Sequence, residues 1–104
     1  HIPTLNELQT LSSIVDGNSN VLKLSGQGSG GGAGTNTSGF SAFLTGYMNY
    51  DGNYTSFEEV THFWSSTEAD AASSYSVHLG FNNNGMFLIN YSKEDGFCVR
   101  CIKD

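Results

Sequence analysis

One alternating segment near the C-terminus limits what this chain can fold into. Between residues 75 and 81, large apolar side chains occupy every second position: Tyr75, Val77, Leu79 and Phe81. This period of two is typical of a β-strand with one buried face. Residues 82–85 read Asn-Asn-Asn-Gly, and both residue types tolerate positive φ in turns. The pattern therefore predicts an antiparallel hairpin with a second strand after Gly85.

The register of this hairpin decides which side chains face the core. A two-residue loop at positions 83–84 or 84–85 pairs odd positions before the turn with even positions after it, and opposed residues share a face. We therefore expect Met86 and Leu88 to join Val77, Leu79 and Phe81 in the core. The other face then carries a second set: Ser76, His78, Gly80, Phe87, Ile89 and Tyr91. A three-residue loop would exchange the two faces.

A helix is expected near the N-terminus. Thr4 can cap it, and Glu7 three residues later completes a capping box. Apolar residues then recur on one face until Asp16-Gly17-Asn18 ends the run: Leu5, Leu8, Leu11, Ile14 and Val15.

Short strands and loops are expected through the middle of the chain. Residues 21–24 are expected to form a short strand or an extended entry, and residues 25–39, rich in Gly, Ser, Thr and Asn, a flexible surface loop. Apolar alternation follows at Phe40, Ala42 and Leu44. Asp51-Gly52 signals a hairpin turn, and residues 57–62 are expected to form a brief helical turn or an irregular link.

The charge composition excludes several kinds of partner. Only 13% of residues are charged, Lys and Arg number four, and the net charge is −6. A nucleic-acid partner would require a basic surface to displace phosphate counterions. Four Lys and Arg residues cannot form one, so we expect no nucleic-acid partner. No apolar run approaches the ~20 residues that span a bilayer, so we expect no direct membrane insertion. Because the chain begins inside an ordered-looking motif at His1-Ile2-Pro3-Thr4, we interpret it as a piece of something longer.

The cysteine and histidine patterns favour neither a redox nor a metal site. Cys98 and Cys101 have the C-x-x-C spacing, but residues three apart on a strand point to opposite faces, so a mutual disulfide is geometrically poor. We expect Cys101 to face inward with Phe97 and Val99, and Cys98 to be a free thiol. The histidines are scattered, and residues 51–62 do not match a calcium loop. We therefore expect no catalytic residue, no metal and no cofactor.

Among the histidines, only His78 is a candidate binding residue. His1 and His62 are expected to be surface or internally satisfied residues. His78 differs because its predicted face also carries Phe87, Ile89 and Tyr91.

Several motifs occur in a fixed order along the chain. They are His1-Ile2-Pro3-Thr4-Leu5-Asn6-Glu7-Leu8, Gly39-Phe40-Ser41-Ala42, Gly46-Tyr47, Asp51-Gly52, Trp64-Ser65-Ser66-Thr67-Glu68 and Val99-Arg100-Cys101. Together they resemble the Fibrobacter succinogenes major paralogous domain family, which is related to the formylglycine-generating-enzyme branch of the C-type-lectin-like fold. The resemblance spans essentially all 104 residues. It covers the later part of the family domain, because the segment that normally precedes the His-Ile-Pro-Thr motif is missing here.

The resemblance implies a fold and a setting. The fold is expected to be α+β and C-type-lectin-like, with an N-terminal helix packed on a short, twisted, mostly antiparallel sheet and long irregular loops. The setting is expected to be the bacterial cell surface or exterior. In the family, Cys101 would pair with a cysteine upstream of His1.

A further resemblance concerns the C-terminal hairpin. Some relatives are targets of diversity-generating retroelements, which replace adenines, typically in Asn codons. Phe87, Ile89, Tyr91 and Cys98 can each be reached in this way from Asn or Ser codons, so the segment looks like a diversified copy.

The expected function is recognition rather than catalysis. We predict a non-catalytic, extracellular ligand-binding or adhesion domain whose C-terminal hairpin contacts a macromolecule. The predicted binding residues are Ser76, His78, Phe87, Ile89, Asn90 and Tyr91. A protein ligand is favoured, and a carbohydrate held by Trp64 and the tyrosines is the alternative ligand. Two other functional classes are a formylglycine-generating-type oxidoreductase and a structural pilus or surface component. The structural alternative for the hairpin is a strand buried on both faces, in which case Phe87, Ile89 and Tyr91 would belong to the core.

Overall fold

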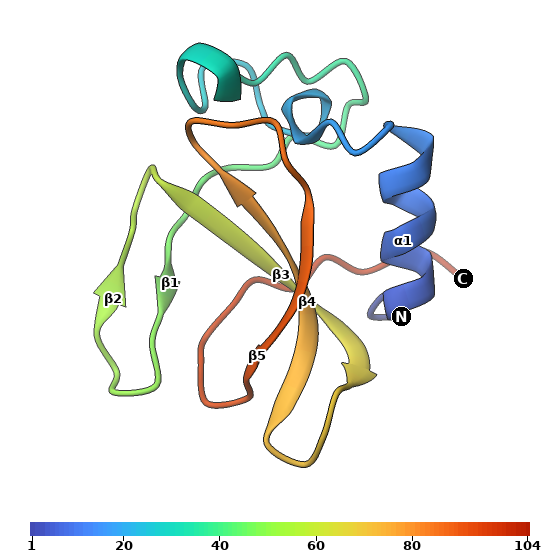
Figure 1. Ribbon diagram of the computed structural model, residues 1–104, viewed down its shortest axis with the longest axis vertical. Coiled ribbons are helices and arrows are strands. Elements are labelled where there is room, and N and C mark those ends of the chain that lie inside the picture. Colours follow the sequence, from blue (N-terminus) through green and yellow to red (C-terminus); the bar gives the residue numbers. More distant parts are fainter.

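The computed structural model describes residues 1–104 and has an α+β architecture (Figure 1). Its elements are α1 (Leu5–Ile14), β1 (Tyr47–Met48), β2 (Tyr54–Thr55), β3 (Val60–Glu68), β4 (Ser73–Gly80) and β5 (Phe87–Ser92), with 3₁₀ turns at Ser19–Val21 and Gly30–Gly32. Strands β3, β4 and β5 form an antiparallel sheet in that order, and β1 and β2 form a separate hairpin. In Figure 1, α1 lies on one side of the larger sheet and the β1–β2 hairpin on the other. The expected α+β class is confirmed.

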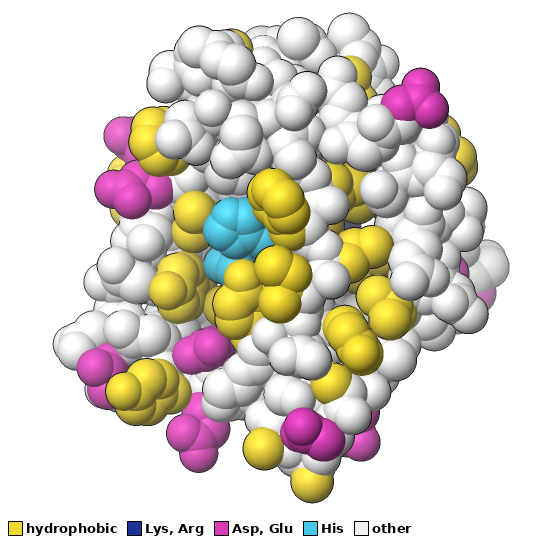
Figure 2. Space-filling model, in the orientation of Figure 1, with side chains coloured by type: hydrophobic (Ala, Val, Ile, Leu, Met, Phe, Trp, Pro, Cys, Tyr) yellow, Lys and Arg dark blue, Asp and Glu magenta, His cyan; other side chains and the backbone are white.

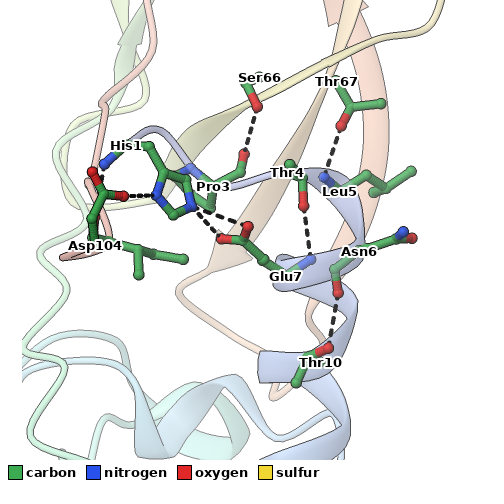
Figure 3. Close-up of polar contacts among 11 residues, drawn as sticks. His1, Pro3, Thr4, Leu5, Asn6, Glu7, Thr10, Ser66, Thr67 and Asp104 are labelled. Atoms are coloured by element: carbon green, nitrogen blue, oxygen red, sulfur yellow. Dashed lines mark hydrogen bonds and ion pairs between the residues drawn. The ribbon is translucent and has the colours of Figure 1, made fainter.

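The start of α1 is fixed by hydrogen bonds to β3 (Figure 3). Thr4 Oγ1 accepts from the backbone N–H of Glu7 at 3.2 Å, which confirms Thr4 as the cap. The N–H of Leu5 donates to Thr67 Oγ1 at 2.9 Å, and the N–H of Ser66 donates to the Pro3 carbonyl at 2.8 Å. The capping box itself is not closed, because the Glu7 carboxylate contacts the imidazole of His1 instead.

The buried face of α1 is narrower than predicted. Leu8 is buried, and Leu11 and Val15 pack against the core from its edge. Ile14 is exposed, because the chain turns away at Asp16-Gly17 before the last turn of the helix can be covered. No helix of the structure combines the length and apolar character that crossing a membrane requires.

The predicted face assignment of the β4–β5 hairpin is confirmed. Val77 opposes Leu88 and His78 opposes Phe87, so odd positions on β4 pair with even positions on β5. Val77 is buried, and Leu88 packs against the core. The predicted two-residue loop is wrong, however, because β4 ends at Gly80 and β5 begins only at Phe87.

Because of this longer connection, Phe81 does not lie in the core as predicted. It is exposed rather than in the core, and its carbonyl accepts from the N–H of Ser29 at 2.8 Å. The connection therefore leaves the sheet plane to meet the loop around Ser29.

Strand β3 begins earlier than predicted. Residues 57–59 form a turn, within the predicted helical turn or irregular link over 57–62, but β3 already begins at Val60, with His62 opposite His78 and Phe63 opposite Val77. Its register shifts between Trp64 and Glu68. The predicted turn at Asp51-Gly52 is confirmed, since it joins β1 to β2.

The core lies between α1 and the sheet. Its buried residues are Leu8, Leu22, Ala42, Leu44, Phe63, Val77 and Leu79. The alternation at residues 40–44 is thereby confirmed for Ala42 and Leu44. Residues 21–24 form no regular strand and make only one parallel bridge, between Lys23 and Ala42.

The Gly-rich loop lies at the surface, as predicted, but hydrogen bonds and close packing hold it in ways that its composition does not indicate. Lys23 is fully buried, and its ammonium donates to Asn20 Oδ1 at 3.0 Å, Gly32 O at 2.9 Å and Asn83 O at 2.9 Å. Gly32 approaches the connection after β4 so closely that a Cβ built on it would lie 2.2 Å from the Phe81 carbonyl oxygen. Only glycine fits there, so composition alone misrepresented this segment.

We expect the substitution Lys23→Met to destabilise the fold by about 2–4 kcal/mol, because it leaves buried carbonyl oxygens without a donor. Chemical denaturation followed by circular dichroism measures this difference. Lys103→Met is the matched control, since Lys103 is exposed at the C-terminus. A Lys23→Met protein with a free energy of unfolding within about 0.5 kcal/mol of the parent would contradict a structural role for the ammonium.

Candidate binding face

Aromatic and imidazole side chains gather on the side of the sheet that faces away from α1. We call this surface the aromatic face, and its members are Tyr47, His62, Trp64, His78, Phe87, Ile89, Tyr91 and Phe97. Figure 2 shows histidine side chains enclosed by hydrophobic ones on this side of the molecule. Alternation along β3, β4 and β5 brings the members together, because paired residues on neighbouring strands share a face.

His62 is the centre of the aromatic face. Its ring stacks on Phe97, with centroids 4.1 Å apart and planes inclined by 10°. Three other rings meet it edge-on, at centroid distances of 4.6 Å for His78, 4.9 Å for Tyr91 and 5.1 Å for Tyr47. Only 3% of His62 is exposed, so it forms the floor of the face.

The rim of the face is more open. Phe87 and Ile89 are 43% and 45% exposed, although they follow one another on the same side of β5. The Phe87 ring meets the His78 ring edge-on, with centroids 5.9 Å apart, and the ring centroids of Trp64 and Phe97 are 4.4 Å apart. The rim therefore offers hydrocarbon surface to solvent while the floor is packed.

Both imidazoles are uncharged at neutral pH. Burial, reinforced by His78, lowers the pKa of His62 to about 4, and burial also lowers the pKa of His78. His78 Nδ1 lies 3.3 Å from His62 Nε2, a distance at which one ring donates to the other. His62 Nδ1 is buried and has no hydrogen-bond partner. Protonating either ring would place a charge among hydrocarbon neighbours.

Tyr91 stays in its neutral form as well. Burial, with smaller effects of Tyr47 and Asp95, raises the pKa of its phenol. The chemistry of the face is thus that of neutral rings, which bind by contact area, stacking and attraction to cations.

The structure brings together four of the six predicted site residues. His78, Phe87, Ile89 and Tyr91 all lie on the aromatic face. Ser76 lies on the same side of the sheet, between Trp64 and Ile89, but it is not part of the accessible face: it is 0% exposed, and its hydroxyl donates to the Ile89 carbonyl at 3.4 Å.

Asn90 does not belong to the face either. It opposes Tyr75 and therefore lies on the other side of β5, next to Leu88. Its assignment as a binding residue disagreed with the alternation that correctly placed its neighbours.

Four members are missing from the predicted set of binding residues, namely Tyr47, His62, Trp64 and Phe97, although Trp64 and the tyrosines are named for the carbohydrate alternative. The available signal was the alternation His62, Trp64 on a strand that continues back to Val60, which would have placed both beside β4. Phe97 carried no such signal, because it follows β5 in a segment without regular structure.

The cysteines are oriented opposite to the prediction. Cys98, not Cys101, packs against the core, and its sulfur lies 3.4 Å from Thr45 Oγ1. Cys101 and Val99 are exposed, while Phe97 faces outward. The reason is a parallel bridge between Phe63 and Cys98 that replaces the regular strand assumed for this segment.

Both thiols are free in the structure. Cys101 lines an apolar cavity of about 330 Å³. This cavity lies on the α1 side of the sheet, and the aromatic face lies on the other side. A disulfide between Cys101 and a cysteine upstream of His1 stays a prediction. No group of three His, Cys, Asp or Glu side chains has a geometry suited to a metal ion.

Comparison with known proteins identifies a family and nothing finer. The family model described as Fibrobacter succinogenes major domain matches residues 1–103. No curated protein and no solved structure matches the chain. The matching description names no activity, ligand or partner.

We expect acid to destabilise the fold through His62. Between its folded pKa of about 4 and its ordinary value of 6.5, the unfolded chain binds more protons than the folded one. Stability is therefore fully present above pH 6.5 and falls as the pH drops towards 4, by about 2 kcal/mol between pH 7 and pH 5. Urea unfolding at several pH values measures it, and His62→Phe should remove most of this slope.

His1→Gln is the control for that measurement. Contacts with Asp104 and Glu7 raise the pKa of the exposed His1, so its contribution is present at low pH and is lost as the pH rises. Removing His1 should leave the loss of stability in acid intact or make it steeper. Equal pH slopes for the His62→Phe and parent proteins would contradict the assignment to His62.

Proposed function

The chain belongs to the Fibrobacter succinogenes major domain family, and we propose that it is a non-catalytic binding domain that recognises a macromolecule through its aromatic face. The observation that carries the proposal is the exposure of Phe87 and Ile89 beside partly exposed rings of the same face. Contiguous apolar surface of this kind marks interaction sites on small proteins. Aromatic residues are also enriched where proteins meet one another.

A protein is the ligand that this surface favours. The face is built on a sheet rather than in a deep pocket, and Met48, Tyr54 and Phe57, in or next to the β1–β2 hairpin, are exposed as well. Large rings supply much contact area at a small loss of rotamer freedom. One side of Trp64 is already occupied by Phe97, which leaves less of it for stacking on a sugar.

The fold type and setting proposed here go beyond the family match. We propose that the domain is C-type-lectin-like, on the basis of one helix packed against an antiparallel sheet and long loops. We also propose that it acts at the surface or exterior of a bacterial cell. Both proposals rest on the sequence resemblance described above.

We further propose that the rim of the aromatic face is a diversified surface. Phe87 and Ile89 project away from Val77 and Leu79, so exchanges at the rim leave the core unchanged. The genomic locus tests this directly. A reverse transcriptase beside a near-duplicate of the segment that encodes residues 63–101 is expected, and a locus without both would refute diversification.

Selection from a displayed random-peptide library tests the binding role. We expect the parent protein to enrich peptides that the Phe87→Ser/Ile89→Ser variant no longer binds, because that variant removes the exposed hydrocarbon of the rim. The matched control is Phe43→Ser/Ile14→Ser, which changes the same residue types at exposed positions outside the face. Peptides that bind the parent and the rim variant equally would refute recognition through this face.

Stability should separate the rim from the core. Phe87→Ser/Ile89→Ser is expected to lower the free energy of unfolding by about 1–2 kcal/mol, since nearly half of each residue is exposed. Leu79→Ala, at a fully buried position, is expected to destabilise by about 2–5 kcal/mol. Thermal and urea denaturation measure both, and a rim variant as unstable as Leu79→Ala would place Phe87 and Ile89 in the core.

A further inference from the structure

We propose that the partner presents a cationic, Lys- or Arg-rich protein segment to the aromatic face. This inference rests on the proposed function and concerns the chemical class of the partner. It follows from the distribution of charge around the face together with the kind of rings exposed on it.

Acidic side chains are concentrated in the part of the chain that builds the face. Seven of the ten Asp and Glu residues lie between positions 51 and 95: Asp51, Glu58, Glu59, Glu68, Asp70, Glu94 and Asp95. The same stretch contains one basic residue, Lys93, whose ammonium lies 2.6 Å from Glu68. Figure 2 shows acidic side chains around the hydrophobic group and no basic patch beside it.

The remaining cations are engaged elsewhere or lie at the C-terminus. Lys23 is buried beneath the Gly-rich loop. Arg100 donates to the Phe40 carbonyl at 2.7 Å, and its guanidinium lies 4.2 Å from the centre of the Phe40 ring. Lys103 belongs to the exposed C-terminal segment. The protein therefore supplies little positive charge of its own to the face. A cationic partner would compete with only one internal cation for the acidic groups there, namely Lys93, which pairs with Glu68.

The rings themselves attract cations. The π-face of Trp, Tyr or Phe carries negative potential and holds an ammonium or guanidinium within about 6 Å of its centre. Phe87 is partly exposed, and Trp64 and Tyr91, elsewhere on the same face, are half-buried. The two imidazoles below them are uncharged at neutral pH, so the floor of the face does not repel a cation. The Arg100–Phe40 contact shows the same chemistry within this protein.

Trp64 provides a direct reporter, because it is the one tryptophan in the chain and belongs to the face. Its fluorescence should change in a saturable way when a hexa-arginine peptide is added, and not with a hexaglutamate or a Gly-Ser hexapeptide. Phe87→Ser and Asp95→Asn should each weaken binding of the hexa-arginine peptide at least about fivefold.

Asp16→Asn is the matched control for charge. It removes the same −1 charge from an exposed position next to the end of α1. It should change the affinity less than twofold. Equal losses for Asp16→Asn and Asp95→Asn would show a general electrostatic attraction and would overturn the inference, as would the absence of a saturable signal.

The selected library peptides separate this inference from the proposed function. Rim-dependent peptides enriched in Lys and Arg support both. Rim-dependent peptides that are neutral or acidic overturn the cationic partner and leave macromolecular recognition intact. If no peptide depends on the rim, the proposed function itself fails.

Discussion

The arrangement of the loops depends on one buried charge, the ammonium of Lys23. Removing an ammonium from water is unfavourable unless polar partners replace its hydration. Here three oxygens do so, at Asn20, Gly32 and Asn83, and no carboxylate takes part. Burial lowers the pKa of this amine, whereas three acceptors favour its charged form. Because the acceptors belong to separate segments, a single side chain fixes the Gly-rich loop and the β4–β5 connection against each other.

The position of the aromatic face follows from that anchor. Two backbone hydrogen bonds of 2.8 Å, from Ser19 to Asn84 and from Ser29 to Phe81, reinforce the same contact. The long β4–β5 connection is thereby held in one arrangement, and β5 enters the sheet in the register that turns Phe87 outward. A preorganised surface loses little entropy on binding. Scaffold contacts on one side of the hairpin thus fix the surface that is proposed to bind a ligand on the other.

Sequence reasoning succeeded where the decisive contacts are local. The cap at Thr4, the turn after Asp51 and the parity of the hairpin depend on neighbours in the chain, and all three were predicted. It failed where distant segments decide. The acceptors of Lys23 come from residues as far away as Asn83, and the stacking of His62 on Phe97 joins segments that have no local pattern in common. The same holds for Cys98, whose orientation is set by a bridge to Phe63.

The division between stability and recognition is sharp at the rim but not at the floor of the face. Phe87 and Ile89 are nearly half exposed, so their exchange is expected to change the proposed binding surface more than it changes the core. His62 is different, because it is buried, stacked and paired with His78 beneath that rim. A replacement there disturbs the rings on which a ligand would rest and the packing of β3 on β4 together. Substitutions at the outer rim are therefore expected to cost less stability than substitutions at the His62 floor, which closes the proposed face from below.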